Sequence, residues 1–187
     1  MERLLEIDGS ILLWIQDNLR CPVLDWIMKC VTRLGNSGMV WISCVVIMLL
    51  FKKSRHTGTL TIFAMLINLL VSNLLLKNLV ARTRPYDAVL GLESIIGRIS
   101  EYSFPSGHAS HSFAAAVVIF MLMPKKIGIP SLILATLISF SRIYIGVHYP
   151  TDIIAGALIG SIIAIIVVTI DRKKCNSQIK DERNQNK

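Results

Sequence analysis

Long apolar stretches separated by short charged segments dominate the chain. Four of these stretches contain no Lys, Arg, Asp or Glu. They are residues 34–51, 58–76, 102–124 and 153–170. Since crossing about 30 Å of hydrocarbon takes roughly 20 helical residues, each stretch approaches or reaches the length of a membrane-spanning helix. A fifth stretch, 127–141, is shorter and gains length if its helix continues through Arg142. The pattern therefore predicts five membrane spans.

The part of the chain before residue 34 is more polar. Residues 22–34 hold several apolar side chains but also Asp25, Lys29 and Arg33. We interpret this segment as a short, polar first span, and a packed re-entrant segment is the alternative. Apolar positions within the first 15 residues could line one face of a helix lying in the membrane interface. The predicted fold class is all-α, a polytopic membrane helical bundle of about six transmembrane helices.

The composition supports a membrane protein and changes the interpretation of the positive charge. Hydrophobic residues make up 53 % of the 187 residues and charged residues only 17 %, which is too apolar for an ordinary soluble domain. The formal net charge is +8, but the bases lie in short segments between apolar stretches. This distribution is typical of loops that face anionic lipid. We therefore expect the bilayer as a partner and no nucleic acid, and the oligomeric state stays open.

Three basic clusters set the predicted orientation. They are Lys52, Lys53 and Arg55, then Lys125 and Lys126, and finally Arg172, Lys173 and Lys174. In a six-span topology all three fall on one side of the membrane, which the positive-inside rule makes cytoplasmic. We therefore predict a domain embedded in the cell membrane over residues 1–171. Residues 172–187 would form a polar cytoplasmic tail without fixed structure.

Three groups of polar residues fall at the opposite, outer face in this topology. They are Lys77 with Arg84-Pro85, then Pro105-Ser106-Gly107-His108, and finally Ser141-Arg142 with His148 and Asp152. The first group lies where the third span meets the outer loop. The second opens the fourth span, and the third bridges the last two. Because loop charge alone defines the topology, the gathering of these groups at one face is independent support for a functional site.

These residue types suit phosphoryl transfer without a metal. Lys77, Arg84 and Arg142 can donate to phosphoryl oxygens, and an arginine can bind two oxygens at once through its planar guanidinium. The Pro-Ser-Gly sequence at 105–107, before an apolar helix, is typical of a helix N-terminus that binds anions through free backbone amides. Gly107 would let the backbone approach a ligand closely.

The same chemistry needs a nucleophile and an acid, and two histidines can supply them near neutral pH. His148 precedes the first turn of the last span, and Asp152 lies four residues further on, within reach of its ring. An aspartate bonded to Nδ1–H would fix the tautomer and leave Nε2 free to attack phosphorus. His108 would then be free to protonate the departing oxygen.

The three groups resemble the signature of the type-2 phosphatidic acid phosphatase superfamily. The signature KxxxxxxRP, PSGH and SRxxxxxHxxxD is matched by KNLVARTRP, PSGH and SRIYIGVHYPTD. The resemblance implies that His148 forms a phosphohistidine, that Asp152 orients it and that His108 is the general acid. It also implies a phosphate cradle, which consists of Lys77, Arg84, Arg142, Ser106 and Gly107. Family members need no metal, and no cofactor is expected.

The expected function is hydrolysis of a lipid phosphate or diphosphate at the outer face of the membrane. The resemblance to small bacterial members favours undecaprenyl diphosphate, and phosphatidylglycerophosphate or phosphatidate is the alternative. A transporter is a hypothesis from another class, because ionisable residues within membrane spans can mark ion paths. A non-catalytic lipid-binding homologue is a third.

A few further residues carry separate predictions. Arg82 and Arg98 match no defining position of the signature, so we expect surface or head-group contacts from them. His111 lies one turn past the PSGH motif and is expected to pack or to contact helices. Gly156 and Gly160 form a GxxxG pair on the last span, which predicts close helix packing.

Overall fold

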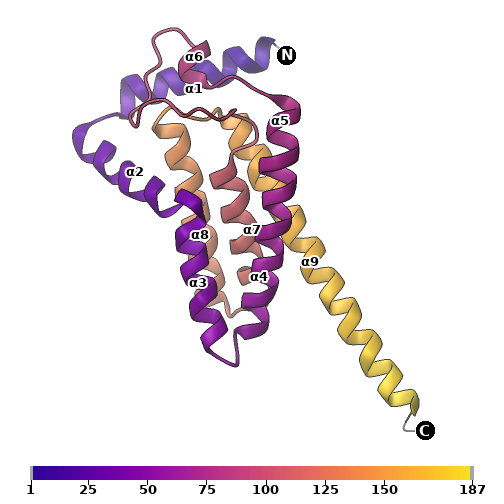
Figure 1. Ribbon diagram of the computed structural model, residues 1–187. Helices are drawn as coiled ribbons and strands as arrows, with labels where there is room; N and C mark the ends of the chain where they lie inside the picture. Colours follow the sequence, from indigo (N-terminus) through magenta and orange to yellow (C-terminus); the bar gives the residue numbers. More distant parts are fainter. Residues whose placement is uncertain (1, 186–187) are drawn as a thin grey trace.

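The computed structural model describes residues 2–185, and all regular secondary structure in that range is helical (Figure 1). The elements are α1 (Glu2–Leu19), α2 (Pro22–Leu34), η1 (Asn36–Gly38), α3 (Met39–Leu50), α4 (Arg55–Asn68), the π-helical η2 (Leu69–Leu76), α5 (Lys77–Val80), α6 (Pro85–Ala88), α7 (Gly107–Leu122), α8 (Lys125–Tyr144) and α9 (Pro150–Gln185). The predicted all-α membrane bundle is confirmed.

α7 is the central helix, and it packs against α4, α8 and α9. Its buried face is built largely from small residues, since Ala109, Ala114, Ala115 and Ala116 are fully buried. Small side chains let neighbouring backbones approach closely, which is how helices commonly associate in membranes.

α9 uses its two glycines to approach α7. A Cβ atom at Gly156 would come within 2.7 Å of the Ser106 carbonyl oxygen, and one at Gly160 within 2.1 Å of the Ser110 carbonyl oxygen. Larger side chains at either position would push the two helices apart. The predicted close packing of the GxxxG pair is therefore confirmed.

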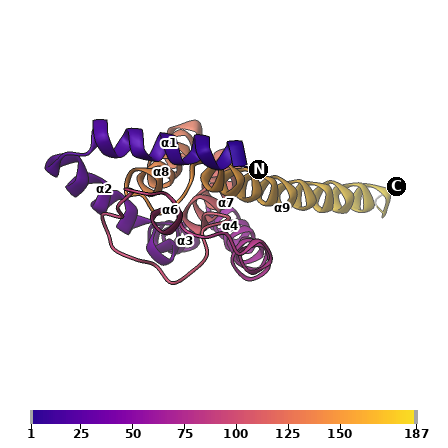
Figure 2. The same ribbon diagram turned by 90° about the horizontal axis from the view of Figure 1, so that it is seen from above.

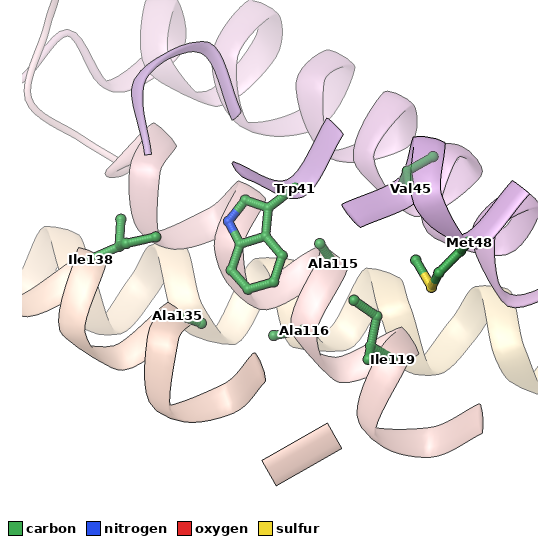
Figure 3. Close-up of a cluster of buried hydrophobic side chains, with 8 residues drawn as sticks. All are labelled: Trp41, Val45, Met48, Ala115, Ala116, Ile119, Ala135 and Ile138. Atoms are coloured by element: carbon green, nitrogen blue, oxygen red, sulfur yellow. The ribbon is translucent and has the colours of Figure 1, made fainter. Parts of the chain in front are cut away.

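A cluster of large and small apolar side chains fills the space where α3 and α8 meet α7. Figure 3 shows this cluster, which consists of Trp41, Val45, Met48, Ala115, Ala116, Ile119, Ala135 and Ile138. The Trp41 indole Nε1–H donates to Ser112 Oγ at 2.9 Å, so its polar atom is satisfied within the core. On the outside of the bundle, apolar side chains such as Leu158 and Ile162 are exposed, as expected for a surface in contact with lipid.

Fewer spans are found than the sequence predicts. Three helical segments are long and apolar enough to cross a membrane, namely Arg55–Ala88, Lys125–Tyr144 and Pro150–Gln178. Pro22–Leu34 and Asn36–Leu50 add a fourth if this pair, bent by 49°, is one span. Gly107–Leu122 is a shorter apolar helix. The predicted count of about six is thus not confirmed.

The predicted separate first span is half of that bent pair. The chain between α2 and α3 contains Gly35, and Ser37 and Gly38 adopt positive φ values of 52° and 68°. Such left-handed residues interrupt the helical hydrogen-bond ladder. The interruption therefore separates α2 from α3 and changes the direction of the chain.

The predicted tail without fixed structure is wrong for residues 172–185. α9 continues without a break to Gln185, because the sequence after Asp171 contains neither proline nor glycine and is rich in good helix formers. Residues 186–187 of the predicted tail lie outside the described part of the chain.

The two ends of the bundle differ in charge. At one end lie the turn between α3 and α4 with the start of α4, the first turn of α8, and the part of α9 after Asp171, which carry the three basic clusters. At the other end α1 lies across the bundle, near α6 and the beginning of α9 (Figures 1 and 2). The residues of the sequence motifs are found at this second end.

Candidate active site

The structure brings all eight predicted site residues to one end of the bundle. Lys77 begins α5 and Arg84 precedes α6. Ser106 is the N-cap of α7, which opens with Gly107 and His108. Arg142 lies in the last turn of α8, His148 in the following link and Asp152 in the first turn of α9. Six of the eight line one cavity of about 550 Å³, and they are Lys77, Arg84, Gly107, His108, Arg142 and His148.

The other two predicted residues are buried behind the cavity wall. Ser106 accepts a hydrogen bond from the Ala109 backbone N–H at 3.4 Å, as an N-cap does. The Ser106 N–H donates in turn to the Asp152 carbonyl oxygen at 3.1 Å. This bond fixes the beginning of α9 to the beginning of α7, and thereby the PSGH motif to the residues around His148.

The His148 ring is almost completely buried, with 2 % of its surface exposed. Its Nε2 lies 3.1 Å from Arg84 Nη1, and its Nδ1 faces Asp152 Oδ2 at 3.5 Å, longer than a normal hydrogen bond. Because a guanidinium only donates, Nε2 carries the lone pair and the proton resides on Nδ1. This is the tautomer that a nucleophilic Nε2 requires.

Burial also keeps this ring neutral. Removal from water disfavours the imidazolium and lowers the pKa of His148 to about 3. The adjacent Asp152 carboxylate opposes the shift, and the positive charges of Arg84 and Arg142 reinforce it. The ring therefore has a free electron pair on Nε2 at neutral pH.

Asp152 is held from both sides. Its Oδ2 accepts from the Ser103 hydroxyl and from the Tyr149 backbone N–H at 3.0 Å. Its Oδ1 accepts from Arg82 Nη1 at 2.6 Å. A fully buried carboxylate with this many donors has one orientation, and that orientation turns Oδ2 toward the His148 ring.

The predicted role of Arg82 is therefore wrong. Its side chain points inward and joins Asp152 to Asp8 on α1, whose Oδ2 accepts from Arg82 Nη2 at 2.8 Å. A long arginine at the membrane surface can reach head groups, but two buried carboxylates here bind it instead. Arg98 is exposed and lies 3.6 Å from Asp87, in agreement with the predicted surface position.

The three cavity cations are held by the protein itself. Lys77 donates to the Glu101 carboxylate, and this contact lowers the pKa of Glu101. Arg84 Nε donates to the Glu101 carbonyl oxygen at 2.8 Å. Arg142 Nη1 donates to Thr32 Oγ1 at 2.8 Å, while its buried Nε has no hydrogen-bond partner among the described residues. The cations are thus oriented toward one space, with Glu101 as the acid among them.

The second histidine faces the break between α2 and α3. His108 Nε2 lies 3.1 Å from Asn36 Oδ1, which can only accept, so this nitrogen carries the proton. His111, one turn further on, lies 3.0 Å from the Gly107 carbonyl oxygen and 3.1 Å from Asn68 Nδ2 through Nδ1. The expected helix contacts of His111 are confirmed, and its ring also lines the cavity.

Sequence reasoning missed Asp8, Ser103, Glu101 and Asn36. A signal existed for Asp8 alone. It shares the buried face of α1 with Leu12 and Ile15, four and seven residues later, so helical periodicity places an acid on an apolar stripe. The other three lie in loops or breaks, where no periodicity indicates which way a side chain points.

Comparison with known proteins places this arrangement among related enzymes. Residues 57–175 match the family described as the PAP2 superfamily. The chain is 34 % identical over 148 residues to an undecaprenyl-diphosphatase of Sulfolobus acidocaldarius, which covers 79 % of this chain and 71 % of that protein. It is 30 % identical over 173 residues to a lipid A 4′-phosphatase of Bacteroides thetaiotaomicron, covering 86 % and 75 %.

A solved structure is similar as well. The crystal structure of a transmembrane PAP2-type phosphatidylglycerolphosphate phosphatase from Bacillus subtilis superimposes with a TM-score of 0.78. The superposition covers 92 % of this chain and 88 % of the other, at 26 % sequence identity. The fold is therefore shared over most of the length of both chains.

Proposed function

The chain belongs to the PAP2 superfamily and is a lipid phosphatase, and from this premise we propose that it converts undecaprenyl diphosphate to undecaprenyl phosphate at the extracytoplasmic face of the cell membrane. One observation carries the proposed mechanism. The buried, neutral His148 ring is turned so that Nδ1–H faces Asp152 and the Nε2 lone pair faces the cavity cations. Such a ring is prepared to form a bond to phosphorus.

In the first step Nε2 of His148 attacks the terminal phosphorus of the substrate. The bond from this phosphorus to the bridging oxygen breaks, and its electron pair leaves with the lipid phosphate. In the bound complex the negative phosphate groups of the substrate favour the imidazolium form of His108, which gives its Nε2 proton to the departing oxygen and becomes neutral. The ring of His148 gains positive charge, which the Asp152 carboxylate stabilises from the Nδ1 side.

In the second step water hydrolyses the phosphohistidine. The now neutral His108 takes a proton from the attacking water, and the bond between phosphorus and Nε2 breaks. Inorganic phosphate leaves, and both histidines return to their starting protonation states. One histidine thus serves as acid and then as base, as the principle of microscopic reversibility requires.

The cavity cations stabilise the charge that develops on the phosphoryl oxygens. Arg84 Nη1 donates to Nε2 of His148 at 3.1 Å, so a phosphoryl group approaching Nε2 meets this guanidinium at once. Arg142 offers its unpartnered Nε, and Lys77 exchanges the Glu101 carboxylate for a phosphoryl oxygen. Charge stabilisation by such fixed donors is usually the largest contribution to catalysis of this kind.

Two observations support a lipid substrate and the membrane face. The cavity wall includes Leu69, Ile96 and Ile99, which can contact the apolar part of a lipid next to its phosphate groups. The three basic clusters lie at the end of the bundle opposite the site, and the positive-inside rule makes that end cytoplasmic. The C-terminus is then cytoplasmic.

The choice of a diphosphate rests on the relative with 34 % identity, and the lipid A and phosphatidylglycerolphosphate phosphatases define the alternatives. Competition between undecaprenyl diphosphate, phosphatidylglycerophosphate and phosphatidate in mixed micelles separates them. Much faster cleavage of phosphatidylglycerophosphate would replace the proposed substrate but not the proposed chemistry.

The chemistry is tested by phosphate release from undecaprenyl diphosphate by the purified protein in detergent and excess EDTA. We expect release in the parent protein and none after His148→Ala. His56→Ala is the matched control, since His56 is exposed and pairs with Asp171 far from the cavity. Release that EDTA abolishes would contradict the metal-free mechanism, and release that survives His148→Ala would exclude His148 as the nucleophile.

A further inference from the structure

We infer that Arg82 and Asp8 are positioning residues that hold the Asp152 carboxylate against His148, and that α1 is therefore part of the active site. The inference rests on the proposed function, because it concerns the orientation of the proposed nucleophile. Neither residue belongs to the sequence signature. Arg82 binds Asp152 directly, and Asp8 is linked to Asp152 through Arg82 and the adjacent Thr151.

Arg82 is fixed by four groups. Its Nη1 donates to Asp152 Oδ1 at 2.6 Å and to Thr151 Oγ1 at 2.8 Å, and its Nη2 donates to Asp8 Oδ2 at 2.8 Å. The face of the guanidinium lies 3.8 Å from the centre of the Tyr149 ring. Contacts at both terminal nitrogens, Nη1 and Nη2, and on the face of the guanidinium leave this planar group little freedom to rotate.

Asp8 fixes the same region from a second side. It is 2 % exposed, and besides Arg82 it accepts from the Thr151 backbone N–H at 3.2 Å and from the Thr151 hydroxyl. Thr151 immediately precedes Asp152, so Asp8 holds both the backbone and the cation on which the Asp152 carboxylate depends. α1 itself is anchored next to these contacts, because Leu12 packs against Tyr149.

The placement of the three residues predicts a specific kinetic signature. Arg82, Asp8 and Asp152 do not line the cavity, whereas Lys77 and Arg84 do. Arg82 is therefore not positioned to bind a phosphoryl oxygen. Its loss should lower kcat through misplacement of His148 and leave substrate binding unchanged.

The charges predict a second signature. Asp152 faces His148, and Arg82 offsets the negative charge of Asp152. Other charged or titratable groups near His148 are Arg84, Arg142, Glu101 and His108. Without Arg82, the uncompensated carboxylate favours the protonated ring. The acid limb of kcat/KM should then move to higher pH, which a general loosening of the fold does not produce.

The test compares Arg82→Gln, Asp8→Asn and Arg82→Lys with Arg98→Gln, in which an exposed arginine is changed. The measurements are kcat, KM, inhibition by inorganic phosphate, and the pH profile of kcat/KM. For Arg82→Gln we expect a loss of about 10²-fold in kcat, the typical effect of a misplaced reacting group. KM and phosphate inhibition should match the parent, and the acid limb should move upward.

The other variants refine the expected result. Asp8→Asn should lower kcat, because Arg82 and Thr151 lose a partner. It should not shift the acid limb upward, because the positive charge of Arg82 remains next to Asp152. Arg82→Lys restores the positive charge, so the acid limb should return toward that of the parent. It should restore kcat only in part, because a lysine ammonium lacks the planar, forked donor geometry of a guanidinium. Arg98→Gln should behave as the parent.

Two results would overturn the inference. One is a parent-like kcat and pH profile in both Arg82→Gln and Asp8→Asn. The other is a loss expressed in KM and phosphate inhibition, which would make Arg82 a phosphate ligand. Failure of the proposed function gives a different pattern, in which the parent itself shows no His148-dependent phosphate release.

Discussion

Gly160 on α9 and Ser110 on α7 lie in backbone contact, so close that a Cβ atom on Gly160 would be 2.1 Å from the Ser110 carbonyl oxygen. Along α9 the contact lies about two turns beyond Asp152, and along α7 it lies less than one turn beyond His108. It sets the distance between the two helices whose first turns carry Asp152 and the PSGH motif. Gly160 thus contributes to the geometry of the site without lining its cavity.

Gly160→Ala should consequently reduce both stability and activity. The added methyl group meets backbone, which cannot move aside as a flexible side chain can, and overpacking of this kind costs about 1–3 kcal/mol. Thermal unfolding in detergent, followed beside phosphate release, measures both effects. Leu158→Ala, which changes a lipid-facing position of the same helix, is the control. An unchanged melting temperature and rate in Gly160→Ala would show that the helices are not held this tightly.

Glu101→Gln should lower KM. The Glu101 carboxylate accepts from Lys77 and lies among the cavity cations, so it competes with a phosphoryl oxygen for the same ammonium. Because the Glu101 side chain is 65 % exposed, solvent screens its charge, and we expect an effect of a fewfold. Steady-state kinetics and inhibition by inorganic phosphate measure it. A raised KM would instead indicate that Glu101 holds Lys77 in position.

The pH dependence should lack an acid limb from His148 in the ordinary histidine range. The pKa of His148 is lowered to about 3, so its ring stays neutral and nucleophilic as the pH falls from 7 to about 5. Protonation removes the lone pair only near the lowered pKa. The profile of kcat/KM tests this, once the titration of the substrate phosphate itself has been measured by ³¹P NMR. A limb near pH 6.5 that is not explained by the substrate would show that the ring is more solvated than in this structure.

The native cysteines can test the membrane orientation. Cys21 lies between α1 and α2 at the end of the bundle with the site, and Cys175 lies in the outer part of α9, and both are exposed. Two variants are needed, one with Cys21 and one with Cys175 as the single remaining cysteine. A membrane-impermeant maleimide should label Cys21 in right-side-out vesicles. It should label Cys175 only in inside-out vesicles. The reverse pattern would place the site on the cytoplasmic side.

Much of the fold could be predicted from the sequence because a bilayer imposes a simple rule. Helices that cross hydrocarbon must be long, apolar and uncharged. The spans over 58–76 and 153–170 can therefore be recognised in the sequence as long apolar stretches without charged residues. The broken first span was harder to predict. Its interruption depends on the left-handed backbone conformation of Ser37 and Gly38. The pattern of apolar residues does not predict this conformation.

The candidate site divides in the same way. The motif residues could be identified from the sequence, because their types and spacing match the family signature. The partners of these residues followed from the tertiary structure. Arg82 meets Asp8 across 74 residues and Asp152 across 70, and these pairings depend on how α1 lies over the bundle. A buried cation binds whichever carboxylates the fold brings within reach, and that proximity is set by helix packing rather than by spacing along the chain.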